Sequence, residues 1–582
     1  MSNETNSAIN HSYKAGKLKQ RAFSPAASGD IITLLFPLFF LGVFFYYPLL
    51  SILKEGLTDT DGRLTLIKVA NIITDLYYLK IILFTIEQAL ISTAASVLLG
   101  LPGAYLISNY EFRGKSIIRA VTTVPFVLPS IIVVLGFVIF FGNNGLLNRS
   151  LMSILNLEEP PLRILYSMKA IILAHTFYNF PIAIRLISAV WSRVNPNIEK
   201  AARSLGARGL RLFSWVILPQ ILPGVLAGAA LIFIFCFTSF AIILVLGGGP
   251  QFSTIEVEIY RLAKVSIDLK GASALAVWEA ILTLIFMFIY TRLQQRASFA
   301  EKVQLRFERP PLSHLVRTPY GPLVIIYIIL TFAIIIAPML AAIHYSFLRR
   351  ASHAARLSYT FRWYGMLITG VQDSAIAVSY LSVIKNSLFF GLMTILFSLP
   401  IGTLIAYLTT RKERIVGSLL ESAVMLPLGI SSIILGLGYI RAYQNLPWDP
   451  TGKWYAIAFA HTVIAYPFVI RSTTAVFRKI NPRLINAAMS LGANRWRTFL
   501  RIEFPMIKSG IIAGATFAFA ISIGEINATL MLYNPNYTTI PIAIYRLISA
   551  YNFFAACALG TVLIVICFLV FLLIDKMGFE VS

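Results

Sequence analysis

Cysteine and charge are both scarce in this sequence, and their scarcity excludes several classes of protein. Only three cysteines occur among 582 residues, at Cys236, Cys557 and Cys567, so a disulfide framework or a cysteine-rich metal site is excluded. Charged residues make up 13% of the chain against 58% hydrophobic residues, a balance far more apolar than a soluble core of this size requires. The composition therefore predicts a membrane protein.

Apolar runs long enough to cross a bilayer, about 20 residues each, recur along the whole chain. Twelve such runs lie near residues 31–53, 81–108, 120–142, 164–190, 221–247, 272–291, 321–343, 383–409, 417–440, 455–475, 507–533 and 555–574. No cleavage pattern follows the first run, so we interpret it as a retained helix. We predict an all-α polytopic membrane protein with twelve transmembrane helices.

Acidic residues are half as frequent as basic ones, 25 against 49, which gives a net charge of +24. The basic residues are spread over loops and form no contiguous face, so a nucleic-acid partner is not expected and the lipid bilayer explains most of the charge. With a cytoplasmic tail at residues 1–30, more Lys and Arg lie inside than outside, as the positive-inside rule requires. Both termini are therefore expected in the cytoplasm.

The chain repeats itself. At an offset of 286 residues HTFYNFPIAIR, from His175, meets HTVIAYPFVIR, from His461, and upstream an offset of 302 pairs Gly136 with Gly438. The change of 16 residues is an insertion near residues 143–163. An even number of helices per repeat gives two parallel halves, related by an axis along the membrane normal. We predict a first six-helix repeat at 31–291, a cytoplasmic linker at 292–320 and a second repeat at 321–582.

Segments 191–220 and 471–508 are too polar to cross the membrane and are predicted to form short helices at its surface. In each, an Ala-Ala pair and a following Leu form a small apolar ridge, and a Gly can end the helix in the left-handed conformation. One basic amphipathic loop of this kind could simply lie on anionic headgroups. Two copies with the same Gly-to-Pro spacing favour a docking surface instead.

The spacing of these loops resembles the cytoplasmic signature of the permease subunits of binding-protein-dependent ABC importers: AAxxxG, nine residues, an aliphatic residue, any residue, then Leu-Pro. The two copies are Ala201, Ala202, Gly206, Val216, Leu218 and Pro219, and Ala487, Ala488, Gly492, Ile502, Phe504 and Pro505. The chain departs from the pattern at its first position, where Lys200 and Asn486 replace the usual Glu. Glu199 precedes the first of these positions.

The resemblance implies a type I ABC importer fold in the bacterial cytoplasmic (inner) membrane. It implies that the two loops couple the chain to two copies of an ATPase subunit, which use ATP and Mg, and that an external solute-binding protein delivers the cargo. This chain is then a transport subunit and not an enzyme, with no cofactor or metal of its own. In agreement, a phosphate-binding loop GxxxxGK[ST] is missing, since the nearest match, GKS at 114–116, has Asn109 in place of the first Gly.

Two fused permease units in one chain resemble a group of importers for iron(III), thiamine and some phosphonates. Residues 235–263 and 521–551 look like the corresponding part of thiamine permeases and their iron(III) relatives, and both end in a TxxxxIY motif expected to begin a short external helix. The resemblance makes iron(III) or thiamine the expected cargo, with a phosphonate or a polyamine as alternatives.

Glu525 is predicted to lie inside the eleventh helix, at the position that Ser239 has in the first repeat. A carboxylate at mid-membrane costs about 2.5–3.5 kcal/mol unless it meets a partner or water. We therefore take Glu525, with Ser239, as the candidate substrate path for a cation; a hydrogen bond to a neighbouring helix is the other explanation. Glu87 and Glu279 are further intramembrane acids. His175 and His461 are expected to pack near the cytoplasmic ends of their helices.

Two other functions remain open. A twelve-helix secondary transporter of the major facilitator kind would share the composition, the charge bias and the parallel repeat, but it would not explain the two AAxxxG loops. An intramembrane enzyme would need an HExxH helix or paired carboxylates on facing helices, and we expect neither.

Overall fold

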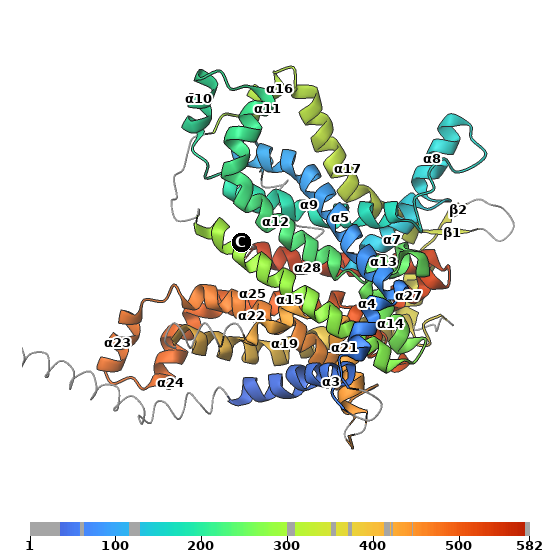
Figure 1. Cartoon of the computed structure of the whole chain (residues 1–582), viewed down its shortest axis with the longest axis vertical. Coiled ribbons are helices and arrows are strands. Elements are labelled where there is room, and N and C mark those ends of the chain that lie inside the picture. The colour runs from blue at the N-terminus through green and yellow to red at the C-terminus, as the bar shows by residue number, and fades with distance from the viewer. Residues whose placement is uncertain are drawn as a thin grey trace, which may run out of the picture.

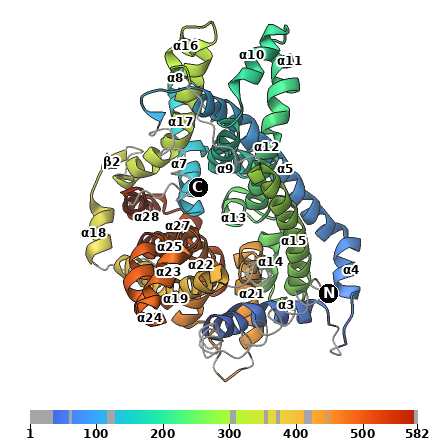
Figure 2. The ribbon, with the colours of Figure 1, turned by 90° about the vertical axis from the view of Figure 1, so that its left-hand side faces the viewer.

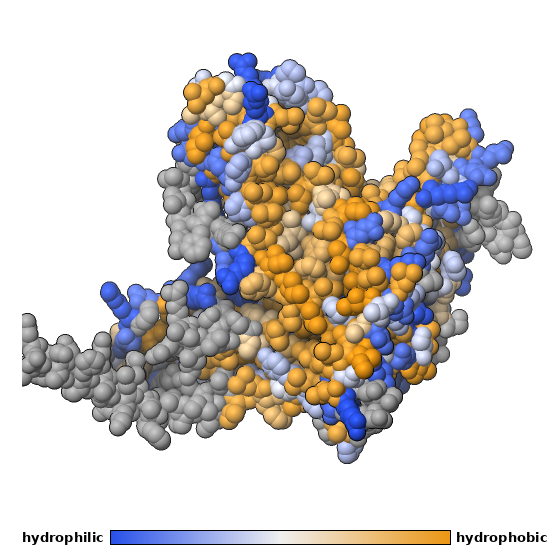
Figure 3. All heavy atoms as spheres, viewed as in Figure 1, coloured by the Kyte–Doolittle hydropathy of each residue, from blue (hydrophilic) through white to orange (hydrophobic). Residues whose placement is uncertain are grey.

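The computed structural model describes residues 35–58, 63–115, 128–299, 309–350, 357–369, 375–411, 420, 423–444, 446–447 and 449–576, so the predicted tail at 1–30 lies outside it. Within these residues eleven helices are long and apolar enough to cross a membrane. They are Leu35–Gly56, Leu76–Asn109, Ser130–Leu155, Met168–Trp191, Gly209–Phe237, Leu269–Gln295, Gly321–Ser346, Tyr380–Thr410, Trp454–Phe477, Trp496–Gly524 and Phe553–Val570. Their apolar side chains form a broad band between polar margins (Figure 3).

The predicted ninth span, 417–440, is represented by a shorter helix. Helix α21 covers Ser432–Tyr443 and follows the 3₁₀ turn η5 (Leu426–Gly429), while residues 412–419 and 421–422 lie outside the described part. Its counterpart in the first half, α7 (Ser130–Phe141), has the same length, and there residues 116–127 are not described.

The prediction of one continuous helix at 221–247 and another at 507–533 was wrong, because both helices are interrupted. Helix α12 (Leu218–Phe237) is followed after three residues by α13 (Ala241–Leu246), and α25 (Phe504–Gly524) is followed by α26 (Asn527–Met531). Hydropathy does not distinguish a straight apolar helix from one that breaks inside the protein, where side chains can take over the freed backbone groups.

The internal repeat appears in the helix bounds themselves. The offset of 286 relates α9 (Met168–Trp191) to α22 (Trp454–Phe477), and the offset of 302 relates α7 to α21. The predicted insertion in the first half holds α8 (Leu146–Leu155), which Asn148 fastens through hydrogen bonds to the carbonyls of Gly142 and Leu162.

The first helix of each half packs against the other half. Helix α3 (Tyr47–Gly56) contacts α15 (Leu269–Phe299) of its own half and α21 of the second, while α17 (Gly321–Ser346) contacts α28 (Phe553–Lys576) and α7. Figure 2 shows α3 beside the second half and α17 beside the first. Two tyrosine hydroxyls form hydrogen bonds between the halves. Tyr443 donates to the carbonyl of Val43 at 2.5 Å, and Tyr327 donates to that of Leu99 at 2.9 Å.

A glycine packs against a proline at each of these helix crossings. A Cβ on Gly438 would lie 2.9 Å from Cβ of Pro48, and a Cβ on Gly136 would lie 3.0 Å from Cβ of Pro338. Small residues allow helices to approach closely inside a membrane. The match of Gly136 with Gly438 in the sequence therefore has a packing reason.

The two predicted surface helices, α10 (Pro196–Ser204) and α23 (Pro482–Ser490), project from the same side of the molecule (Figure 1). The opposite side carries α8, α14 (Ile255–Lys264), α27 (Ile540–Ser549) and a hairpin of β1 (Leu348–Arg350) with β2 (Leu357–Tyr359), in which Leu348 pairs with Tyr359. We call these the α10/α23 side and the opposite side. The parallel arrangement of the halves is thus confirmed.

Smaller helices complete the fold. These are α4 (Ile67–Thr74), α16 (Leu312–Val316) and α18 (Arg362–Thr369). The predicted linker ends against the first half, where Arg309 donates to the carbonyl of Ser192 at 2.8 Å and Glu111 accepts and donates backbone hydrogen bonds with residues 310–312.

Replacing Gly438 by Leu should destabilise the protein by about 1–3 kcal/mol, because the new side chain overlaps Pro48 of the exchanged helix. The measurement is the thermal unfolding midpoint of the purified protein in detergent. Gly365→Leu is the matched control, since nothing lies within 4 Å of a Cβ at Gly365 on α18. Equal midpoints for the two variants would contradict the packing role.

Candidate functional site

The first AAxxxG loop is a capped helix followed by a sharp turn. Asn195 accepts a hydrogen bond from the backbone N–H of Asn197 at 2.9 Å, and a proline opens α10. At the other end the N–H of Ala207 donates to the carbonyl of Ala202, and Gly206 has φ +88°, which together make a Schellman motif. The motif Gly is therefore required by the backbone.

The second loop repeats this construction. Asn481 caps α23 by accepting from the N–H of Arg483 at 3.0 Å, Gly492 has φ +86°, and the N–H of Ala493 donates to the carbonyl of Ala488. The loops differ in charge, because Glu199 and Arg203 form an ion pair at 2.7 Å only in the first. Ile485 and Met489 occupy these positions in the second.

Each loop presents a leucine to its surroundings. Leu205 is 90% exposed and Leu491 is 89% exposed, among the most exposed large apolar side chains of the described residues. In each Ala-Ala pair one alanine, Ala201 or Ala487, is exposed and the other is half-buried. Nothing lies within 4 Å of a Cβ added at either motif Gly, so both turns are open on their outer face. The pair of loops forms two equal, unpartnered apolar tips on the α10/α23 side.

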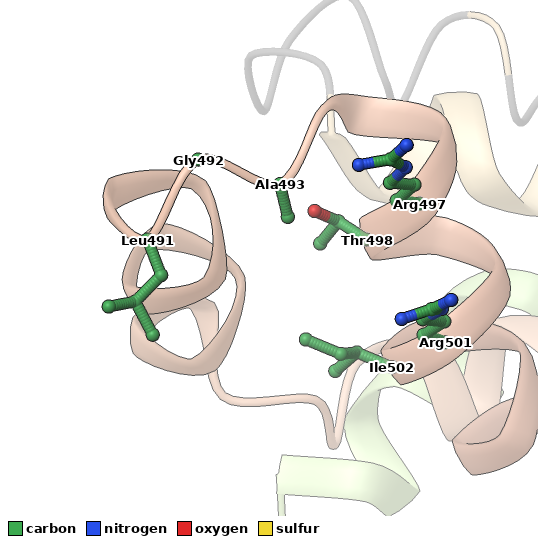
Figure 4. A pocket seen from close by; sticks show the side chains of 7 residues that line it. All are labelled: Leu491, Gly492, Ala493, Arg497, Thr498, Arg501 and Ile502. Atoms are coloured by element: carbon green, nitrogen blue, oxygen red, sulfur yellow. The ribbon is translucent and has the colours of Figure 1, made fainter.

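A hollow of about 370 Å³ separates the second tip from the helix that follows. Figure 4 shows Leu491 on one wall, and Ala493, Thr498 and Ile502 pointing toward the gap. The residues that line it are Leu491, Gly492, Ala493, Arg497, Thr498, Arg501 and Ile502. The lining combines the apolar side chains of Leu491, Ala493 and Ile502 with two basic side chains, Arg497 and Arg501.

The rest of each motif lies at the start of the next membrane helix. Short α11 (Gly209–Leu212) and α24 (Arg495–Thr498) pass through one π turn each, η2 (Phe213–Ile217) and η6 (Phe499–Glu503), into α12 and α25. Val216 and Ile502 are half-buried there. Leu218 is also half-buried, whereas Phe504, Pro219 and Pro505 are exposed. The loops are thus continuous with the fifth helix of each half.

Glu525 occupies the break between α25 and α26 and is 8% exposed. Its Oε1 accepts from the N–H of Ala528 at 2.8 Å, and its Oε2 accepts from the N–H and the hydroxyl of Thr529 at 2.9 and 2.6 Å. Nε2 of His461 lies 3.4 Å from Oε2. These contacts agree with a carboxylate that is hydrogen-bonded within the protein.

His461 joins this break to two other helices. Its Nδ1 lies 2.7 Å from the hydroxyl of Ser522, which also accepts from Thr394 on α19 (Tyr380–Arg411) at 3.0 Å. In the first half, Nδ1 of His175 lies 3.3 Å from the hydroxyl of Ser92 on α5 (Leu76–Asn109), and half-buried Ser239 stands at the matching break. His461 therefore links α22 to α25 and α26, whereas His175 links α9 to α5.

The predicted place of His175 and His461 was wrong. Both lie in the first third of their helices, away from the end that leads into α10 and α23. Helices α9 and α22 each begin at the opposite side and end at the α10/α23 side, so both histidines lie nearer the opposite side. The sequence pattern did not indicate this depth. Glu87, the other predicted intramembrane acid on α5, is exposed on the helix surface.

The TxxxxIY segments form helices, as predicted, but they are buried and not superficial. The first N–H of α14, that of Ile255, donates to the hydroxyl of Thr85 at 3.1 Å, and that of Ile540 in α27 donates to Ser387 at 2.7 Å. Six of the ten residues of α14 are buried. The second helix of each half therefore holds its short helix inside the protein.

Sequence reasoning missed one group at the site. The expectation that no carboxylates pair on facing helices was wrong, because Glu256 of α14 and Glu279 of α15 interact while both are buried. The rest of α14, a loop and the first turns of α15 separate Glu256 from Glu279 in sequence, so only the packing of α14 on α15 brings them together. Among the described residues no three His, Cys, Asp or Glu side chains gather as a metal site.

Comparison with known proteins matches both halves to one family. The family model described as "Binding-protein-dependent transport system inner membrane component" matches residues 92–299 and again 379–578. A thiamine transport system permease protein of Escherichia coli (strain K12) is 26% identical over 506 residues, 86% of this chain and 90% of the relative. One from Brucella suis biovar 1 is 27% identical over 509 residues, 86% of this chain and 88% of the relative.

A further relative matches one half only. The putative 2-aminoethylphosphonate transport system permease protein of Salmonella choleraesuis is 30% identical over 260 residues, which are 45% of this chain and 91% of the relative. Its length therefore corresponds to a single repeat.

Glu525→Gln should lower the thermal unfolding midpoint, because the new amide presents N–H donors where Thr529 donates. Losing such a buried hydrogen bond costs about 1–3 kcal/mol. Ser239→Ala, at the matching break of the first half, is the control and should have a smaller effect. An unchanged midpoint in Glu525→Gln, together with lost transport, would instead support contact with the cargo.

Proposed function

The chain belongs to the family of binding-protein-dependent transport system inner membrane components, and from this premise we propose that it forms the complete membrane pathway of an ATP-driven thiamine importer. The family makes it a transport subunit, a permease of the ABC importer type. In this proposal two copies of an ATPase subunit, which bind ATP and Mg, dock on the α10/α23 side in the cytoplasm. A solute-binding protein delivers the cargo to the opposite side, outside the cell.

The two equal apolar tips support the ATPase partners. Leu205 and Leu491 project from helices of identical construction, and both are nine-tenths exposed. Apolar side chains exposed in this way mark a surface that a partner covers. Two copies of one tip suit two copies of one protein. The tips continue through η2 and η6 into α12 and α25, so a movement of the partner would reach the membrane helices directly.

Transport in this proposal is alternating access. The loaded binding protein docks, the ATPases close on ATP, and the loops pass that movement to the two halves, which open a central path to one side and then to the other. The repeat relates the halves by an axis along the membrane normal, so the path runs between them.

Thiamine is preferred as cargo because two relatives that match 86% of this chain are thiamine permeases. The 2-aminoethylphosphonate relative covers one half, so a phosphonate is the second candidate. The family match over both halves argues against a secondary transporter of the major facilitator kind.

Uptake of labelled thiamine decides the function. Cells with the gene should take up thiamine more than tenfold faster than cells without it, and ATP depletion or vanadate should abolish the difference. Uptake that follows an ion gradient and ignores vanadate would show a secondary transporter. If thiamine uptake does not depend on the gene, 2-aminoethylphosphonate and ferric iron are measured in the same cells.

Gly206→Asp and Gly492→Asp should each reduce uptake at least tenfold. At φ near +87° a side chain costs about 1–2 kcal/mol, and the added carboxylate stands on the docking surface without a clash inside the chain. The ATPase should also fail to copurify. Gly365→Asp, an equally open glycine on α18, serves as the control. Full uptake in both loop variants would rule out the coupling role.

A further inference from the structure

Two buried carboxyl groups at the boundary between the halves have no basic partner among the described residues. Glu256 is 1% exposed and Glu279 is 0% exposed. Among the described residues, neither oxygen of Glu279 nor Oε2 of Glu256 has a hydrogen-bond partner. Their electrostatic neighbours are each other, the Ser431 hydroxyl and, for Glu256, also Glu525. No described Lys, Arg or His forms an ion pair with either.

The other buried carboxylates of the same region are satisfied. Glu258, two residues further along α14, accepts from Arg261 at 2.6 Å and from the hydroxyl of Tyr77 at 3.1 Å. Glu525 accepts from Ala528 and Thr529. A buried charge without a partner is strongly unfavourable, so an acid in such a place stays neutral until a positive group meets it. The unpartnered oxygens of Glu256 and Glu279 thus point to a positive group that comes from outside the chain.

The pair lies where the two halves meet. Helices α14 and α15 belong to the first half, while Ser431 directly precedes α21 of the second, and α14 and α15 both contact α21 (Figure 2). Glu279 stands ten residues inside α15, well below the opposite side where that helix begins. The cargo path of the proposed function runs along this boundary.

The pair also breaks the symmetry of the repeat. The IYRL segments align at an offset of 285, which places Pro541 at the position of Glu256 and Ala543 at that of Glu258. The offset of 302 places Pro129 at the position of Ser431. At the symmetry-related place Pro541 and Pro129 therefore stand where Glu256 and Ser431 would be. A pair needed only to hold short helices in place would be expected in both halves.

We propose that Glu256 and Glu279, with the Ser431 hydroxyl, form the site in the membrane that receives a positively charged group of the cargo. The inference rests on the proposed function and names the chemical class that this path accepts, an organic cation. Thiamine carries a permanent positive charge on its thiazolium ring. The site holds the cation between the halves, and the path releases it when the halves separate on the α10/α23 side.

The test uses the complete importer, the full chain with its ATPase and binding protein, in liposomes. Glu256→Gln, Glu279→Gln and the double variant keep the side-chain volume but remove the charge. Thiamine uptake should fall at least tenfold in each, while the ATPase rate stimulated by thiamine-loaded binding protein stays within twofold. The thermal midpoint should stay level or rise, since an unpartnered buried acid is removed. Glu279→Asp should recover part of the uptake, and Glu87→Gln is the exposed intramembrane control.

Each outcome decides. Uptake at the wild-type rate in the double variant overturns the site, and so does a loss of uptake that comes with a lower midpoint and a lost ATPase response, which marks a structural role. If the wild-type importer carries 2-aminoethylphosphonate and not thiamine, the proposed cargo has failed, but the ammonium group of that probe tests the same site. If it carries only solutes without a positive group, the site falls as well.

Discussion

No water reaches the backbone of a chain that crosses the hydrocarbon core, so every peptide group there must find its partner within the protein. Unbroken helices meet this demand alone. This chain interrupts its helices at several depths, and side chains then supply the missing partners. Thr85 and Ser387 accept the first N–H groups of α14 and α27, and Glu525 accepts those of α26. These acceptors satisfy the first backbone N–H groups of the short inner helices and so stabilise them inside the protein.

The exchange of first helices makes the halves interdependent. Helix α3 fills a place beside α21 and α17 one beside α7, with a proline against a glycine in both crossings. The larger hydrophobic core accordingly contains residues of both halves, such as Leu135 and Leu559. Neither half buries its own apolar surface alone, so a movement between them has to occur within these packed contacts and not across an open gap.

The two halves resemble each other at the α10/α23 side and differ at the boundary between them. The α10/α23 side carries two loops that agree in cap, turn and exposed leucine, which suits the two identical partners of the proposed function. At the boundary between the halves the agreement ends, since Glu256 faces Glu279 on one side only and Pro541 takes the matching place. A single cargo molecule near the axis needs one set of contacts. Glu258 and Glu525 also have no carboxylate at the matching position of the other half. They hold α14 and α26 by ordinary hydrogen bonds.

The sequence by itself determined the membrane class, the parallel repeat and the two AAxxxG loops, because hydropathy, an offset and a short motif are all local or periodic signals. It also pointed to the intramembrane acids Glu525 and Glu279. Tertiary structure decided what these acids meet, which helices break and at what depth the histidines lie. Glu525 became a helix cap, and Glu279 found Glu256 from a helix that the sequence placed outside. A break and a buried pair depend on neighbours distant in the chain, and no periodicity of the local sequence encodes them.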